Sequence, residues 1–109
     1  MRMTIGTHWH ILQWVKIYRW NEAKNAQLKR ERGVGFEEVV AAIERGGLLD
    51  VLKHRNAARY PHQSILVVAL GNYVYLIPFI EEAHGYFLKT IIPSRKATRD
   101  YLKDGVSDA

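Results

Sequence analysis

The spacing of apolar residues predicts two helices in the first half of the chain. One apolar stripe is formed by Phe36, Val39, Val40 and Ile43, which fall at i, i+3, i+4 and i+7. Glu37 and Glu38 stand in the first turn of this helix, where the helix dipole favours negative charge. A more polar helix is expected over residues 22–32, with Asn21 as its N-cap and Gly33 at its end.

Apolar runs in the second half predict a sheet. Residues 65–70 are apolar at consecutive positions, which favours a central strand covered on both faces. Gly71-Asn72 suits a two-residue hairpin turn, and residues 73–80 return as the next strand, in which Pro78 requires a bulge or an edge position. Further strands are expected at 15–20, 48–53 and 86–92. Ser94 is a suitable N-cap for a last helix.

This order of elements predicts an α+β fold. Two N-terminal helices pack on an antiparallel sheet of about four strands, and a short helix closes the chain. The length of 109 residues suits one domain. We expect that domain over residues 15–103, with 1–14 as an N-terminal extension of unclear role and 104–109 as a frayed tail.

Composition narrows the function classes. The chain has no cysteine, which excludes disulfides, thiolate metal sites and a cysteine nucleophile. No apolar run approaches the ~18 residues that span a bilayer, and residues 1–14 make a poor signal peptide. His8 and His10 are spaced for chelation but have no carboxylate or thiol nearby. We therefore expect a cytoplasmic protein with no membrane contact, no metal and no cofactor.

Positive charge is concentrated at the two ends of the chain. The formal net charge is +5. Residues 1–32 hold seven Lys and Arg against two Glu, and residues 86–109 hold five against three Asp, whereas residues 33–85 hold four against six acids. If the fold brings the two ends together, the surface attracts a polyanion such as RNA or DNA. Charge that serves only solubility is the alternative.

Three stretches resemble the BrnT family of toxins, in the family's order. Tyr18–Asn25 is similar to its W-D-E-x-K-N opening, Arg32–Glu38 to its H-G-V-S-F-E-E helix junction, and Lys89–Ala97 to its closing R-I-I-S-A-R-K-A. The chain departs from the pattern where Asn21 replaces Asp, Arg32 replaces His and Gly35 replaces the capping Ser. Asn21 and Gly35 still cap helices, so these departures put chemistry in doubt more than fold.

The resemblance implies a RelE/ParE-like toxin that blocks translation by cleaving RNA without a metal. It also implies a BrnA-like antitoxin partner with a DNA-binding domain, through which the complex reaches operator DNA. Such cleavage needs a group that takes the 2′-OH proton, cations that stabilise the pentavalent phosphate, and an acid for the leaving oxygen.

The final strand and helix carry the strongest cationic candidates. Lys89, Arg95 and Arg99 are predicted to be catalytic and Lys96 to bind RNA, because arginine and lysine neutralise phosphate and helix N-termini attract anions. The alternative is solvated charge paired with Asp100.

Four other residues complete the predicted site. His54 is a candidate general acid or base, since histidine titrates near neutral pH. Arg19 and Lys24 are expected to contact phosphate, and Trp20 to stack on a base, although a tryptophan is more often a core anchor. Two function classes stay open: a ribonuclease toxin, and a non-catalytic module of the same fold that binds nucleic acid or protein.

Overall fold

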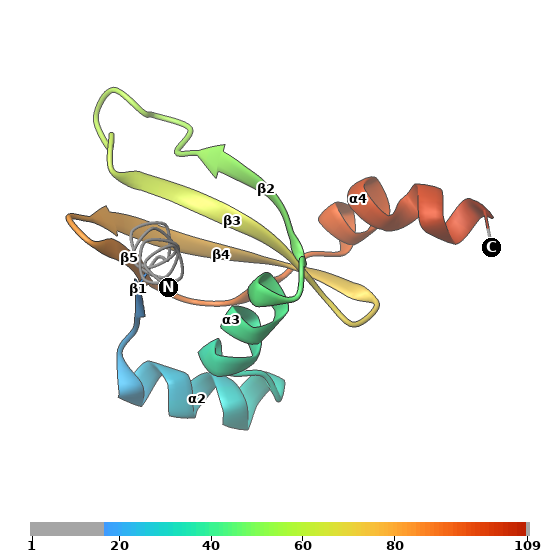
Figure 1. Cartoon of the computed structure of the whole chain (residues 1–109), viewed down its shortest axis with the longest axis horizontal. Coiled ribbons are helices and arrows are strands. Elements are labelled where there is room, and N and C mark those ends of the chain that lie inside the picture. Colours follow the sequence, from blue (N-terminus) through green and yellow to red (C-terminus); the bar gives the residue numbers. More distant parts are fainter. Residues whose placement is uncertain (1–16, 109) are drawn as a thin grey trace, which may run out of the picture.

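The computed structural model describes residues 17–108, with side chains through Leu102 (Figure 1). The elements are β1 (Ile17–Arg19), α2 (Glu22–Arg32), α3 (Phe36–Glu44), β2 (Leu48–Lys53), β3 (Gln63–Leu70), β4 (Tyr73–Glu82), β5 (Gly85–Leu88), β6 (Ile92–Pro93) and α4 (Arg95–Asp108). The predicted α+β class is confirmed. The α4 helix runs past residue 104, where the sequence predicted a frayed tail, whereas residues 1–14 lie outside the described part.

Side chains at the helix ends fix the boundaries as predicted. Asn21 Oδ1 accepts the Lys24 N–H at 2.9 Å, and Gly33 ends α2 in the left-handed region at φ 73°. At α3 the backbone of the cap residue is the donor: the Gly35 N–H donates to the side chain of Glu38, at 2.7 Å from its Oε1. The absent capping Ser therefore does not prevent the α3 helix from starting at this position.

The sheet has six strands and is mixed, whereas the sequence predicted about four antiparallel strands. Its order is β1-β5-β4-β3-β2, with the short β6 beside β4. All pairs are antiparallel except β1 with β5. The β3–β4 hairpin turns through Gly71 at φ 68°, with Leu70 opposite Tyr73, as predicted for Gly71-Asn72.

Pro78 lies in the interior strand β4, opposite Ile65 of β3, and not at an edge. The predicted irregularity falls on its other side. Phe79 pairs with Leu88 of β5 and Leu76 pairs with Ile92 of β6. The β5–β6 segment therefore has one more residue between these two pairs than β4 has. Proline has no N–H to donate to the ladder. The segment 89–91 therefore leaves regular strand geometry.

Each face of the sheet has its own apolar core. The α2 and α3 helices cover one face with a cluster that includes Leu28, Phe36 and Ile77, all essentially buried. A smaller cluster joins α4 to the opposite face through Ala97, which packs with Val67 and Val74. Ile77 and Phe79 are buried in the first cluster, and Tyr75 packs against it. Strands flank β4 on both sides, so β4 is not an open edge.

Within residues 17–108, no helix is both long enough and apolar enough to cross a bilayer.

Candidate nucleic-acid interface

The segment between β5 and α4 positions the predicted cations. The Lys89 N–H donates to the Pro78 carbonyl at 2.8 Å, which holds the backbone of Lys89 against β4. Leu88, the last residue of β5, is buried in the helix-covered core, and Lys89 follows it outside the strand. Its side chain is exposed.

The start of α4 is fixed to β4 by two neighbouring hydroxyls. Ser94 Oγ accepts the Ala97 N–H at 3.0 Å and is therefore the predicted N-cap. Thr98 Oγ1 accepts the Val74 N–H at 2.8 Å and donates to the Ser94 carbonyl at 2.7 Å. These bonds hold the first turns of α4 at the sheet, with Arg95 exposed to solvent.

Arg99 lies one helical turn beyond Arg95, so the two side chains share a side of α4. Arg99 Nε is 3.9 Å from Asp100 Oδ1, and Lys96 Nζ is 2.8 Å from Asp100 Oδ2. These are the charge pairs that the sequence offered as the alternative for this helix. Both are exposed, and exposed pairs are worth about 0–1 kcal/mol, so they compete weakly with a phosphate.

Arg32 is a fourth cation at this place. Its Nη1 donates to the carbonyl of Ile91, 59 residues away along the chain. This bond brings the last turn of α2 to the segment that follows Lys89 and precedes Arg95. We name Arg32, Lys89, Arg95 and Arg99 the cationic edge, because each lies in the stretch 89–99 or is hydrogen-bonded to it. No acidic residue lies in the first turn of α4.

Arg32 was missed as a site residue by the sequence reasoning, which noted it only as a departure from the BrnT pattern. A signal was present: α2 ends in a cluster of Lys29, Arg30 and Arg32. Cations in a last turn are also favoured by the helix dipole, so the cluster alone did not point to a site.

His54 does not join the cationic edge. Its N–H donates to the Gln63 carbonyl at 3.1 Å, and Gln63 lies opposite Ile80, whereas the Ser94 N–H bonds to Val74. Six residues of β4 separate these two levels, about 20 Å at ~3.3 Å per residue, whereas the Lys89 N–H bonds to Pro78, only two residues from the level of His54. His54 instead accepts the Asn56 N–H on Nδ1 at 2.9 Å and packs on Tyr60, with ring centroids 4.5 Å apart.

Two of the three predicted RNA contacts near β1 take structural positions. Trp20 stacks on Phe36 with centroids 5.5 Å apart, and its Nε1 is buried with no hydrogen-bond partner among the described residues. The core-anchor alternative for Trp20 therefore accounts for its position. Arg19 forms a two-pronged contact with Glu82, at 3.2 and 3.3 Å. Lys24 is half-buried on α2, and its RNA contact stays a prediction.

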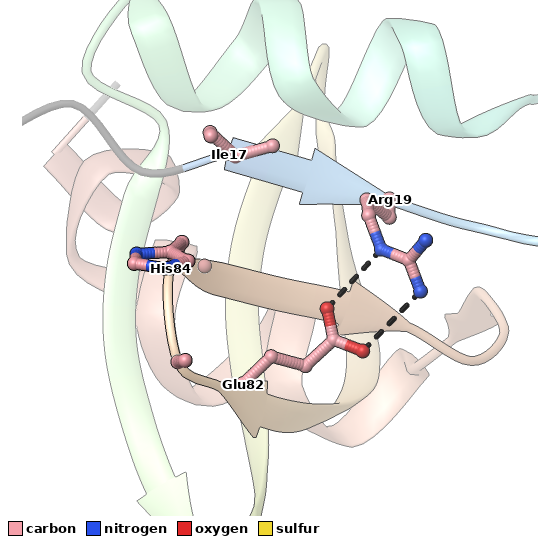
Figure 2. Close-up of a pocket in the computed structure, with 6 residues that line it drawn as sticks. Ile17, Arg19, Glu82 and His84 are labelled. Carbon is pink, nitrogen blue, oxygen red and sulfur yellow. Dashed lines mark hydrogen bonds and ion pairs between the residues drawn. The ribbon is translucent and has the colours of Figure 1, made fainter.

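Figure 2 shows a cavity of about 290 Å³ at the β1–β5 end, with Arg19 and Glu82 on one side and His84 across from them. Two further cavities, of about 210 and 520 Å³, adjoin the two ends of α3. Lys89, Arg95, Arg99 and His54 line none of these three. The four side chains of the cationic edge are exposed, which suits contact with a polymer strand.

Among residues 17–108, no three His, Asp or Glu side chains gather closely enough to hold a metal ion. His8 and His10, the chelating pair considered from the sequence, lie outside the described residues.

Comparison of the chain with family models, with curated proteins and with solved structures gives no match. The structure itself defines an α+β domain that carries the four exposed cations of the cationic edge.

Proposed function

We propose that this chain is the toxin of a toxin–antitoxin pair, acts in the cytoplasm, and binds and cleaves RNA at the cationic edge without a metal. The observation that carries the proposal is the Arg32–Ile91 bond, which brings a cation of α2 to the connection that holds Lys89 and leads to Arg95. An exposed cluster of this kind fits a phosphodiester backbone, because each cation releases a counterion when it meets a phosphate.

In this proposal the arginines stabilise the charge that develops on the phosphate. Guanidinium groups bind phosphate oxygens through two parallel N–H donors and keep their charge at all relevant pH values. Lys89 supplies a further point charge. The 2′-OH attacks the neighbouring phosphorus and gives up its proton to water, the bond to the 5′-oxygen breaks to leave a 2′,3′-cyclic phosphate, and the 5′-oxygen takes up a proton from water. His54 is given no part in these steps, because its contacts among the described residues are with Asn56, Tyr60 and Gln63.

A specific observation favours the second class, a module that binds nucleic acid without cutting it. The cationic edge contains arginines and a lysine but no histidine or unpaired carboxylate beside them, so a general base is not evident among the described residues. Binding then needs only the charge, whereas cleavage needs the proton transfers as well.

One experiment separates the two classes. Purified protein is incubated with RNA in EDTA, beside Arg95→Ala and a matched variant, Arg59→Ala, which removes the same charge from the 54–62 loop. The toxin proposal expects fragments with the wild type and Arg59→Ala and none with Arg95→Ala. Intact RNA that nevertheless shifts in a binding assay, and is released by Arg95→Ala, identifies the non-catalytic module.

The proposed partner is a BrnA-like antitoxin that carries a DNA-binding domain and conveys the complex to its operator. The resemblance of Tyr18–Asn25 and Lys89–Ala97 to BrnT supports it. Co-expression with the adjacent gene product is expected to restore growth that the toxin alone arrests.

A further inference from the structure

Most of the large apolar side chains that remain exposed lie on or beside β2, at one edge of the sheet. In the described part of the chain these are Ile17, Leu48, Leu49, Val51, Leu52, Ile92 and Tyr101. Four of the seven are consecutive or nearly so on β2, and Tyr101 is hydrogen-bonded to Asp50 of the same strand. Single exposed apolar residues are ordinary, but a contiguous group marks an interaction surface. We name the four β2 side chains and Tyr101 the β2 edge.

The backbone of β2 is also open on this side. Within residues 17–108, β2 is the last strand of the sheet and pairs only with β3. The His54 N–H bonds to the Gln63 carbonyl, so the backbone N–H and C=O of His54 point toward β3. The direction of these backbone groups alternates along the strand, and those of Val51 and Lys53 therefore point away from β3. The Val51 N–H is held by Asp50 Oδ1 at 2.8 Å. The carbonyls of Val51 and Lys53 and the Lys53 N–H remain available to a neighbouring strand.

Charge beside this edge is positive. Lys53, Arg55 and Arg59 follow the apolar part of β2, and no carboxylate occurs between Asp50 and Glu81. All three cations are exposed, and no ion pair of theirs is found among the described residues. A partner with acidic side chains is therefore attracted here, and a basic one is repelled.

A second copy of the chain fits this edge poorly. Residues 44–62 hold four cations (Arg45, Lys53, Arg55, Arg59) against two carboxylates (Glu44, Asp50). Pairing β2 with its own copy places two such net-positive segments side by side. Like charges facing each other across an interface are unfavourable, so charge complementarity selects a different chain.

We propose that the β2 edge binds an extended segment of a partner protein, apolar at alternate positions and acidic between them, which joins the sheet as a further strand. Backbone bonds to Val51 and Lys53 supply affinity, and apolar contacts with Leu52 or Val51 together with carboxylates near Arg55 supply specificity. This surface shares α4 with the cationic edge but none of its residues, so the inference goes beyond RNA binding and does not depend on it.

The test uses the full chain and a pair of labelled six-residue peptides, matched to the length of β2. One alternates valine and glutamate, and the other alternates valine and lysine. Fluorescence anisotropy is expected to show binding of the glutamate peptide alone. Reversing two charges (Arg55→Glu with Arg59→Glu) is expected to weaken it at least about tenfold, a scale typical of a loss of 1.4 kcal/mol. Circular dichroism checks that each variant is folded.

A matched pair of apolar variants tests the place of binding. Val51→Lys on the β2 edge is expected to abolish binding, whereas Ile92→Lys, at a similarly exposed apolar residue on β6, leaves it unchanged. The proposal is overturned if neither peptide binds, if both bind equally, or if the two lysine variants behave alike. It is also overturned if the chain is a stable dimer in light scattering that Val51→Lys dissociates, because the occupant is then a second copy. RNA binding by the cationic edge is measured in parallel and is expected to be the same in Val51→Lys.

Discussion

The Tyr101 phenol donates a hydrogen bond to Asp50 Oδ2 at 2.8 Å, and Oδ1 of the same carboxylate accepts the Val51 N–H at 2.8 Å. One side chain thus joins α4 to β2 and occupies an outward amide of the edge strand. Natural sheets restrict pairing at open edges by such local means. Asp50 therefore limits which strands can add to β2 while it fixes the C-terminal helix.

The Asp50 contact predicts an altered titration of Tyr101. The hydrogen bond to Asp50 raises the pKa of the Tyr101 phenol above its ordinary value of 10.0, and nearby negative charge adds to this. The link between α4 and β2 is thus present below pH 10 and is lost as the pH rises through the raised pKa. Asp50→Asn is expected to move the pKa back toward 10. Near-UV difference absorbance against Tyr101→Phe isolates this phenol, and an unchanged titration in Asp50→Asn contradicts the assignment.

Replacing Arg32 is expected to weaken RNA binding through loss of charge and of position. Arg32→Ala removes one cation, so the slope of log affinity against log salt becomes shallower by about 0.7 for a single strand. Arg32→Lys keeps the charge but loses the planar fork that reaches the Ile91 carbonyl. We expect it to keep the salt slope and bind more weakly than the wild type. Arg59→Ala is the control. If the salt slope changes equally in that variant, the effect is not specific to Arg32, and Arg32 does not belong to the interface.

Asn25 is the one polar or charged side chain among the buried residues described, and it joins α2 to α3. Its Oδ1 accepts the Phe36 N–H at 2.8 Å, and its Nδ2 lies 3.0 Å from both oxygens of Glu37. Asn25→Ala leaves a buried N–H without a partner, at a cost of roughly 1–3 kcal/mol. Chemical denaturation measures this loss. Gln27→Ala, on the same helix but less buried, is expected to change stability by no more than about 0.5 kcal/mol.

Glu37 adds a pH dependence to the same contact. The Asn25 hydrogen bond is the main cause that lowers the pKa of Glu37 below 4.5, and Lys29 contributes further. A depressed pKa gives stability that is present above 4.5 and is lost as the pH falls through the lowered value. The side chain is 52% exposed, so the effect is small. Stability measured against pH is expected to fall less steeply below 4.5 in Glu37→Gln, and parallel curves would exclude the effect.

Local signals in the sequence predicted the helices and most strands, because their causes lie within a few residues. Asn21, Gly33 and Ser94 each act on their own helix end, and each was placed correctly. Long-range pairings had no such signal. The parallel pairing of β1 with β5 joins residues 17 and 85, and the Arg32–Ile91 bond spans 59 residues. The candidate site divides in the same way: Lys89, Arg95 and Arg99 were proposed from residue type and position and their role stays a prediction, whereas the place of His54 depends on sheet order.

Gly85 is the residue that lets β1 approach β5. A Cβ at this position would collide with the backbone carbonyl of Ile17, the residue paired with Gly85. Alanine is otherwise acceptable in a strand, so Gly85→Ala tests the contact itself. We expect β1 to move away, with a loss of about 1–3 kcal/mol in the free energy of unfolding. Ala83→Ser, an exposed change in the adjoining turn, is expected to cost no more than about 0.5 kcal/mol. Hydrogen exchange at Tyr18 and Arg19 is expected to quicken in Gly85→Ala alone; unchanged exchange there would mean that β1 tolerates the methyl group and that its parallel pairing does not need glycine.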